Sequence, residues 1–177
     1  AEKYFNKAEK QDRESPSVLG ERARVYVMVD PVSYASQIEK YKDKCIKKGF
    51  NQPKYLWAIL LIEGDITNDP YTAGGQYLAA SEKNTEDVEG VMRASRVFED
   101  IDLRYSGQAL GMYMNSNPNP SNVIKDLYEK LLVKYARLLI KDGNYSEALN
   151  IVNEALQEYP DSEELKKIKE EVSSKKE

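Results

Sequence analysis

The side chains that could do chemistry in this 177-residue chain are mainly carboxylates, lysines and tyrosines. Because the chain has no histidine, it lacks the commonest general base, the usual zinc ligand and the usual pH sensor. Its single cysteine, Cys45, excludes an intrachain disulfide and a metal cluster held by cysteines alone. Acid–base catalysis would therefore depend on carboxylates and tyrosines. We expect no metal site and no cofactor.

Two acidic stretches resemble sites but lack essential partners. Residues 65–69 offer the oxygen ligands of a calcium loop, yet Pro70 stands where such a loop needs glycine and Gln76 replaces its terminal glutamate. We interpret this stretch as a helix-capping turn. The carboxylates of residues 99–102 have no recognisable nucleophile or partner beside them. The sequence therefore predicts a protein that is not an enzyme. An enzyme based on carboxylates and tyrosines ranks behind the two binding functions described below.

Basic side chains recur at helical spacing near the C-terminal end. One helix face would carry Lys130, Lys134, Arg137 and Lys141, which stand at i, i+4, i+7 and i+11. Such a face can hold an anionic partner segment through charge-assisted contacts, or it can simply be a solvated face. The lysines between residues 40 and 48 are interpreted as a solvated outer face.

Aromatic side chains in the middle of the chain are candidates for lining a ligand pocket, because a phenol combines a broad apolar body with a polar tip. The six candidates are Tyr55, Trp57, Tyr71, Tyr77, Tyr105 and Tyr113. Packing between helices is the competing interpretation of the same residues. Cys45 lies on an apolar helix stripe and is interpreted as a small buried hydrophobe.

The overall charge and the length of the apolar runs limit the classes of partner. A net charge of −4 gives no general attraction for nucleic acid or for an anionic membrane. The most apolar uninterrupted run covers only residues 55–62, whereas crossing a bilayer takes roughly 20 apolar residues. We therefore expect no nucleic-acid partner and no transmembrane segment.

Helix start and stop signals recur along the whole chain, and strand patterns do not. Asp69 and Pro70 signal another helix start, but Gly74 and Gly75 follow closely. Either this helix begins only after the glycines, or it includes them and they allow close packing. The other expected helices span about residues 31–48, 53–63, 85–105, 108–114 and 121–141. Thr85 is the expected N-terminal cap of the helix over residues 85–105. Residues 115–121 are expected to form a loop.

A spaced pattern of large and small residues follows from the end of the long helix: Leu132-x2-Tyr135-Ala136-x2-Leu139-x3-Gly143-x-Tyr145-x2-Ala148-x3-Val152-x2-Ala155-x4-Pro160. Alanines stand where two antiparallel helices must approach closely, and a proline ends the second helix. With this pattern, residues 129–162 resemble one tetratricopeptide repeat. Leu132 and Val152 depart from the family, which commonly has tryptophan and an aromatic residue at these positions.

The resemblance implies an all-α fold, in which antiparallel helix pairs stack as a right-handed superhelical array within one domain, residues 1–177. Residues 17–122 follow only the helix-pair rhythm and are expected to form divergent hairpins. Residues 163–177 are expected to form a C-terminal capping helix. Residues 1–16 contain Ala1-x3-Phe5-x2-Ala8, which is similar to the second helix of a repeat, so they would form a partial repeat.

The resemblance also implies a function. In this family the first helix of each pair lines the concave surface, on which a peptide or a partner helix can lie. The basic face would then hold a protein or peptide with an acidic segment, and the chain would be a non-catalytic scaffold. Assembly with copies of itself is also possible. Val133 and Arg137 stand where some members use lysine and asparagine to grip a C-terminal carboxylate, which argues against the binding of chaperone tails.

A small-molecule- or solute-binding helical domain is the alternative function. Residues 71–75 and 105–111 contain glycines and are similar to periplasmic tetratricopeptide-type proteins that accompany solute transporters. This alternative requires an enclosed pocket lined by aromatic side chains. The start in mid-repeat, together with abundant tyrosine, asparagine and lysine, favours an exported bacterial protein, periplasmic or lipid-anchored, over a cytoplasmic one.

Overall fold

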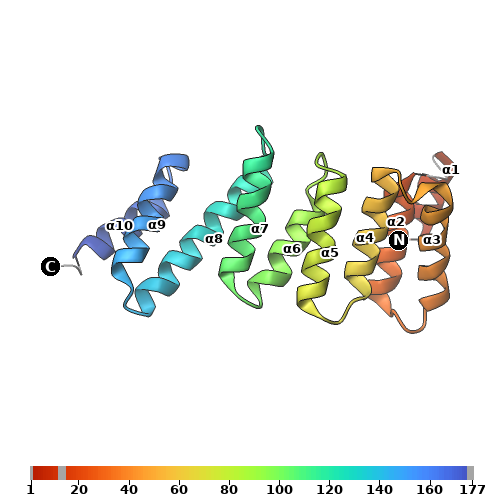
Figure 1. The fold of residues 1–177 in the computed structure, drawn as a ribbon, viewed down its shortest axis with the longest axis horizontal. Coiled ribbons are helices and arrows are strands. Elements are labelled where there is room, and N and C mark those ends of the chain that lie inside the picture. Colours follow the sequence, from red (N-terminus) through yellow and green to blue (C-terminus); the bar gives the residue numbers. More distant parts are fainter. Residues whose placement is uncertain (1, 12–14, 175–177) are drawn as a thin grey trace. The chain divides into compact units, whose positions relative to one another are not determined.

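The structure is a computed structural model that describes residues 2–11 and 15–174 as α-helices joined by turns and short loops (Figure 1). No strand occurs in these ranges, and neighbouring helices pack in pairs. The all-α prediction is therefore confirmed. The helices are α1 (Glu2–Gln11), α2 (Pro16–Val29), α3 (Ala35–Gly49), α4 (Pro53–Ile66), α5 (Pro70–Lys83), α6 (Glu89–Glu99), α7 (Leu103–Ser116), α8 (Asn122–Lys141), α9 (Tyr145–Glu158) and α10 (Glu163–Ser174).

The packing divides the chain into two compact units, Ala1–Phe98 and Glu99–Glu177, called here the first and the second unit. The single-domain organisation stays a prediction. Ala1 and the side chains of Phe5 and Ala8 lie outside the described part of the chain, so the partial repeat stays a prediction as well.

The first unit is built around α4, which packs against α2, α3 and α5. Its buried side chains point to several sides of the helix, as expected for a sequence that is apolar all round. They include Trp57, Ala58, Ile59, Leu61 and Ile62, each at most 4% exposed. The prediction of a central core helix after Pro53 is thus confirmed.

Close packing explains one of the two adjacent glycines in α5. A Cβ atom on Gly74 would lie 2.4 Å from the ring of Phe98, so only glycine allows that ring to pack there. A Cβ atom on Gly75 would meet nothing within 4 Å. Helix α5 runs through both positions, so it does not begin after the glycines. Of the two expectations, close packing is the correct one, and it applies at Gly74.

Prolines and aspartates fix where several helices begin. Pro53 and Pro70 occupy the first turns of α4 and α5, where a missing N–H removes no helical hydrogen bond. The Asp69 side chain accepts the N–H of Thr72 at 2.8 Å, and hydrogen bonds from Thr72 lower the pKa of this carboxyl group. The stretch 65–69 therefore ends in a helix cap, as predicted.

The expected helix over residues 85–105 is in fact two helices. α6 begins only at Glu89, whose N–H donates to Asp87 Oδ1 at 2.7 Å, so Thr85 is not its cap. The chain then turns after Glu99, and Asp102 Oδ1 accepts the N–H of Arg104 at 2.8 Å to start α7. Asp102 is thus a helix cap within the carboxylate cluster. α7 is also longer than the predicted 108–114.

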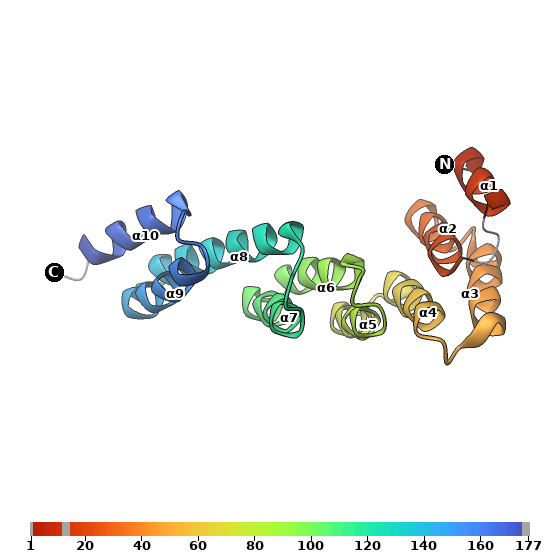
Figure 2. The same cartoon turned by 90° about the horizontal axis from the view of Figure 1, so that it is seen from above.

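In the second unit, α8 and α10 lie in one layer and α7 and α9 in the other (Figure 2). α8 packs against α7, α9 and α10, and α9 also packs against α10. Alanines allow these close contacts, because Ala136 and Ala148 are fully buried at the α8–α9 contact. The buried side of α10 consists of Leu165, Ile168 and Val172, as the sequence predicts.

Cys45 lies in the core of the first unit, where it is 0% exposed. Burial raises the pKa of its thiol to about 11. Since the thiolate is the reactive form, we expect native protein to react negligibly with an aromatic disulfide reagent at pH 8. Absorbance of the released thiol would check this, with protein unfolded in guanidinium chloride as the control that releases one equivalent. Rapid reaction of the native protein would show that Cys45 is accessible.

Candidate binding surfaces

The exposed side of α8 carries the basic face that the sequence predicts. Its four members, Lys130, Lys134, Arg137 and Lys141, are all exposed. The opposite side of the helix is buried at Leu131, Val133, Ala136 and Leu139. Burial of that apolar stripe fixes the rotation of α8 about its axis, and so the cations must face outward.

Two members of the basic face are paired with carboxylates of the same unit. The Lys134 ammonium group contacts Glu99, and Arg137 Nη2 lies 3.0 Å from Glu164 Oε1. The side chains of Lys134 and Arg137 are 57% and 53% exposed, and ion pairs this exposed contribute about 0–1 kcal/mol. The cationic face is thus partly neutralised by weak contacts.

A shallow pocket of about 280 Å³ lies beside this face. Its apolar lining comes from Leu127, Leu131 and Val133. Charged side chains complete the lining, namely Lys130, Lys134 and Arg137 with Glu99 and Glu164. The two carboxylates were not foreseen, because they come from α6 and α10 and share no helical spacing with the lysines.

The six predicted aromatic residues are divided between the two units. In the first unit, Trp57 on α4 and Tyr77 on α5 are buried core residues. Tyr55 is half-buried and Tyr71 is exposed. In the second unit, Tyr105 is exposed and Tyr113 is half-buried, both on α7. The structure thus places Trp57 and Tyr77 in the packing role, and the aromatic pocket stays a prediction.

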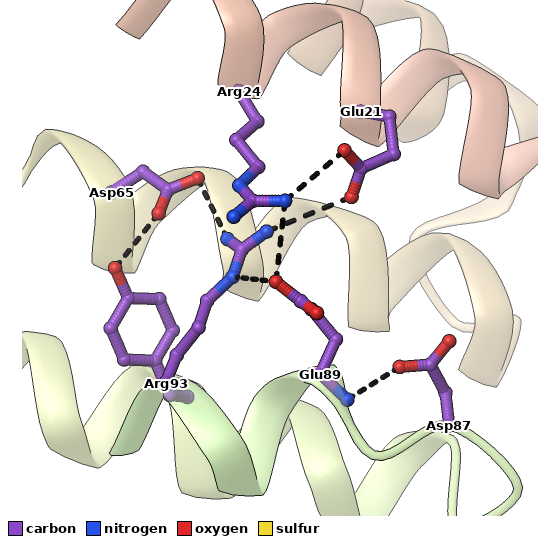
Figure 3. A network of polar contacts seen from close by, with 7 residues as sticks. Glu21, Arg24, Asp65, Asp87, Glu89 and Arg93 are labelled. Atoms are coloured by element: carbon purple, nitrogen blue, oxygen red, sulfur yellow. Dashed lines mark hydrogen bonds and ion pairs between the residues drawn. The ribbon is translucent and has the colours of Figure 1, made fainter. Parts of the chain in front are cut away.

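A network of charged side chains and one tyrosine joins four helices of the first unit (Figure 3). At its centre is Arg93 on α6, whose side chain is only 7% exposed. Arg93 Nη1 lies 2.8 Å from Asp65 Oδ2 on α4, and its Nε donates to Glu89 Oε1 at 2.7 Å. The Tyr77 hydroxyl group on α5 donates to the other Asp65 oxygen at 2.8 Å.

Residues of α2 complete the network. Glu21 Oε1 lies 3.7 Å from Arg93 Nη2, and Arg24 Nη1 lies 3.3 Å from both Glu21 and Glu89. Each charged group thus has an opposite charge within ion-pair distance, which a buried charge requires. We interpret the network as structural. Sequence spacing does not reveal it, because Asp65 and Arg93 are 28 residues apart.

The pKa shifts in this network have opposing causes. Burial raises the pKa of the Asp65 carboxyl group, while the Arg93 guanidinium and the Tyr77 hydroxyl group act in the other direction. Burial alone would lower the pKa of Arg93, but the surrounding carboxylates, Asp65 first, raise it. Burial and the adjacent Asp65 also raise the pKa of Tyr77. Arg93 is thus the largest of the influences that favour the ionised form of Asp65.

A larger groove of about 660 Å³ lies in the second unit between α7 and α9, with α8 as its floor. We call it the α7–α9 groove. The floor consists of Tyr128, Leu131, Leu132 and Tyr135, and Gly107 and Gly111 of α7 form part of one wall. Ile151, Glu154 and Glu158 of α9 form the other. Sequence reasoning noted the stretch 105–111 for its glycines but missed Tyr128 and Tyr135, since three helices must assemble before the groove exists.

In ranges 2–11 and 15–174, no group of three or more histidine, cysteine, aspartate or glutamate side chains is arranged to hold a metal ion. The helices in the same ranges also include none with the length and apolar character needed to cross a membrane.

Comparison with known families identifies the C-terminal part of the chain. Residues 129–169 match the family model of the tetratricopeptide repeat, which covers most of α8, all of α9 and the first turns of α10. No curated protein and no solved structure matches the chain significantly. Residues 129–169 therefore form a tetratricopeptide-like segment, and the chain around it consists of helices that pack in neighbouring pairs.

Proposed function

We propose that the chain is a non-catalytic scaffold that binds a protein or peptide, and that the basic face of α8 receives an acidic segment of this partner. One observation carries the proposal: four exposed cations lie on the first helix of the segment that matches the tetratricopeptide repeat. Repeats of this kind use extended surfaces to bind other proteins. Cations at helical spacing on such a surface favour a partner of opposite charge.

The ion pairs of the basic face suggest that carboxylates of a partner can take the place of the protein's own carboxylates. Glu99 and Glu164 contact Lys134 and Arg137 through ion pairs whose basic members are more than half exposed. An acidic partner segment can replace them with little loss, because pairs of this kind contribute about 0–1 kcal/mol. Arg137 offers a planar fork of donors that suits a carboxylate.

The pocket beside the face adds an apolar requirement. Leu127, Leu131 and Val133 line a volume of about 280 Å³, which is enough for apolar atoms of a partner side chain to leave water. The partner segment should therefore carry aspartate or glutamate next to a leucine, valine or similar side chain. Charge alone would give a weaker and less selective contact.

Charge reversal on the basic face is the test. We expect Lys134→Glu/Arg137→Glu to weaken binding of a fluorescent 12-residue peptide of alternating glutamate and leucine by at least about tenfold, or 1.4 kcal/mol. The salt dependence of binding should fall with it, because fewer charges then meet at the interface. Fluorescence anisotropy at several salt concentrations measures both effects.

The matched control is Lys40→Glu/Lys47→Glu, which makes the same change in net charge on exposed positions of α3. This variant should bind the acidic peptide nearly as well as the wild type. Equal losses in the two variants would mean that only net charge matters. Unchanged affinity of Lys134→Glu/Arg137→Glu would remove the basic face from the proposal.

A further inference from the structure

Gly107 and Gly111 stand one turn apart on the α7 wall of the α7–α9 groove. A Cβ atom on Gly107 would lie 3.6 Å from Leu131, and one on Gly111 would lie 3.5 Å from the Tyr128 hydroxyl oxygen. Both distances are ordinary van der Waals contacts. Packing therefore does not require glycine at either position, in contrast to Gly64, where a Cβ atom would lie 2.4 Å from the Tyr77 ring.

These glycines make α7 less stable than alanine would, because glycine gains backbone freedom on unfolding. What their missing side chains provide is open space in the groove wall. Residues that destabilise their own helix, as these glycines do, are expected at sites where they serve a function.

The opposite wall carries negative charge that the protein itself leaves unbalanced. Glu154 and Glu158 are exposed and one turn apart near the C-terminal end of α9. Like charges at this spacing repel each other, and the negative end of the helix dipole disfavours both. Within the described part of the chain, no lysine or arginine forms an ion pair with either carboxylate.

Other charges of the groove do not offset these carboxylates. The one arginine in the lining, Arg104, is paired with Asp102 at 2.6 Å. Tyr128 lines the groove together with both carboxylates, and burial, with Glu158 and Glu154, raises the pKa of its phenol. The groove thus combines an apolar floor with a negative edge.

We propose that the α7–α9 groove is a second binding surface, which takes a protein segment bearing lysine or arginine beside apolar side chains. The cation would lie between Glu154 and Glu158, next to the Tyr128 phenol. Its apolar neighbours would pack on Leu131, Leu132 and Ile151. This surface prefers the opposite charge from the basic face of α8, so the two surfaces can hold different segments at once.

The test uses the full chain and a fluorescent 12-residue amphipathic peptide of leucine and lysine, with the same peptide carrying glutamate for lysine as its counterpart. We expect the lysine peptide to bind the wild type, and Glu154→Gln/Glu158→Gln to weaken that binding at least tenfold and to flatten its salt dependence. Gly111→Leu should weaken it as much, because the new side chain fills the groove.

Matched variants separate the groove from general effects. Glu82→Gln/Glu86→Gln removes the same charge from exposed positions of the first unit, and Gly75→Leu makes the same substitution in open space on α5. Both should leave lysine-peptide binding unchanged. Thermal midpoints of Glu154→Gln/Glu158→Gln and Gly111→Leu should equal or exceed that of the wild type, which shows that weaker binding does not come from unfolding.

Three results would overturn the proposal. The first is undiminished binding of the lysine peptide to both groove variants, and the second is equally tight binding of the glutamate peptide in the groove. The third is self-association of the wild type in sedimentation that Gly111→Leu abolishes, since the occupant would then be a second copy of the chain. The Lys134→Glu/Arg137→Glu variant should still bind the lysine peptide, so failure of the basic-face proposal is distinguishable from failure of this one.

Discussion

Replacement of Arg93 by methionine is expected to lower the free energy of unfolding by about 3–5 kcal/mol, the usual cost of removing one partner from a buried ion pair. The side chain is only 7% exposed, and its partner Asp65 is 12% exposed. Methionine fills similar space but leaves the Asp65 carboxylate without its cation. Urea denaturation followed by circular dichroism measures the change.

The loss should depend on pH in a definite direction. Burial raises the pKa of Asp65, and the Arg93 guanidinium is the largest of the influences that oppose this rise. A folded-state pKa above the unfolded value means stability that is present at low pH and is lost as pH rises through the folded pKa. The Arg93→Met variant should therefore be less impaired near pH 4 than near pH 8.

The matched control for this prediction adds Asp65→Asn to Arg93→Met. The neutral amide can still accept the Tyr77 hydroxyl hydrogen bond, so this double variant should recover part of the lost stability and lose the pH dependence. A loss below about 1 kcal/mol for Arg93→Met would contradict a structural role for the network, since surface pairs contribute that little.

Replacement of Gly90 by alanine is expected to lower the free energy of unfolding by about 1–3 kcal/mol, the range for overpacked positions. A Cβ atom there would lie 2.7 Å from the Tyr77 carbonyl oxygen and 2.9 Å from the Ser81 nitrogen. Both are backbone atoms of α5, so no side chain can rotate away. The start of α6 must shift instead. The same urea experiment measures this effect.

Gly75→Ala is the control for Gly90→Ala, because it makes the same substitution inside a helix without any neighbour within 4 Å. It should raise the free energy of unfolding by up to about 1 kcal/mol through helix propensity alone. If Gly90→Ala were equally stabilising, this would contradict the close contact between Gly90 of α6 and the backbone of α5.

The helices and their buried faces could be predicted because periodicity is a local property. Ala136 and Ala148 mark the close α8–α9 contact, and Leu165, Ile168 and Val172 form the buried side of α10, as expected. The break after Glu99 was missed, because apolar spacing continues from Phe98 through Ile101 to Tyr105 across it. Asp102 before Leu103 is the cap signal that indicates the new helix start.

The surfaces were only partly predictable because they combine distant residues. The basic face follows from spacing along one helix, but its partner Glu164 lies 27 residues from Arg137. Arg93 looks in sequence like one of many helical arginines, and only the fold surrounds it with Asp65, Glu89 and Glu21. The α7–α9 groove needs three helices in place before Tyr128 and Glu154 face the same space.

The most direct test of the scaffold proposal is an amide chemical-shift titration of isotope-labelled protein with the acidic peptide of glutamate and leucine. We predict shifts concentrated in α8 between residues 130 and 141 and at Glu99 and Glu164, whose ion pairs the peptide replaces. Shifts confined to other helices, or no saturable shifts at all, would contradict binding at the basic face.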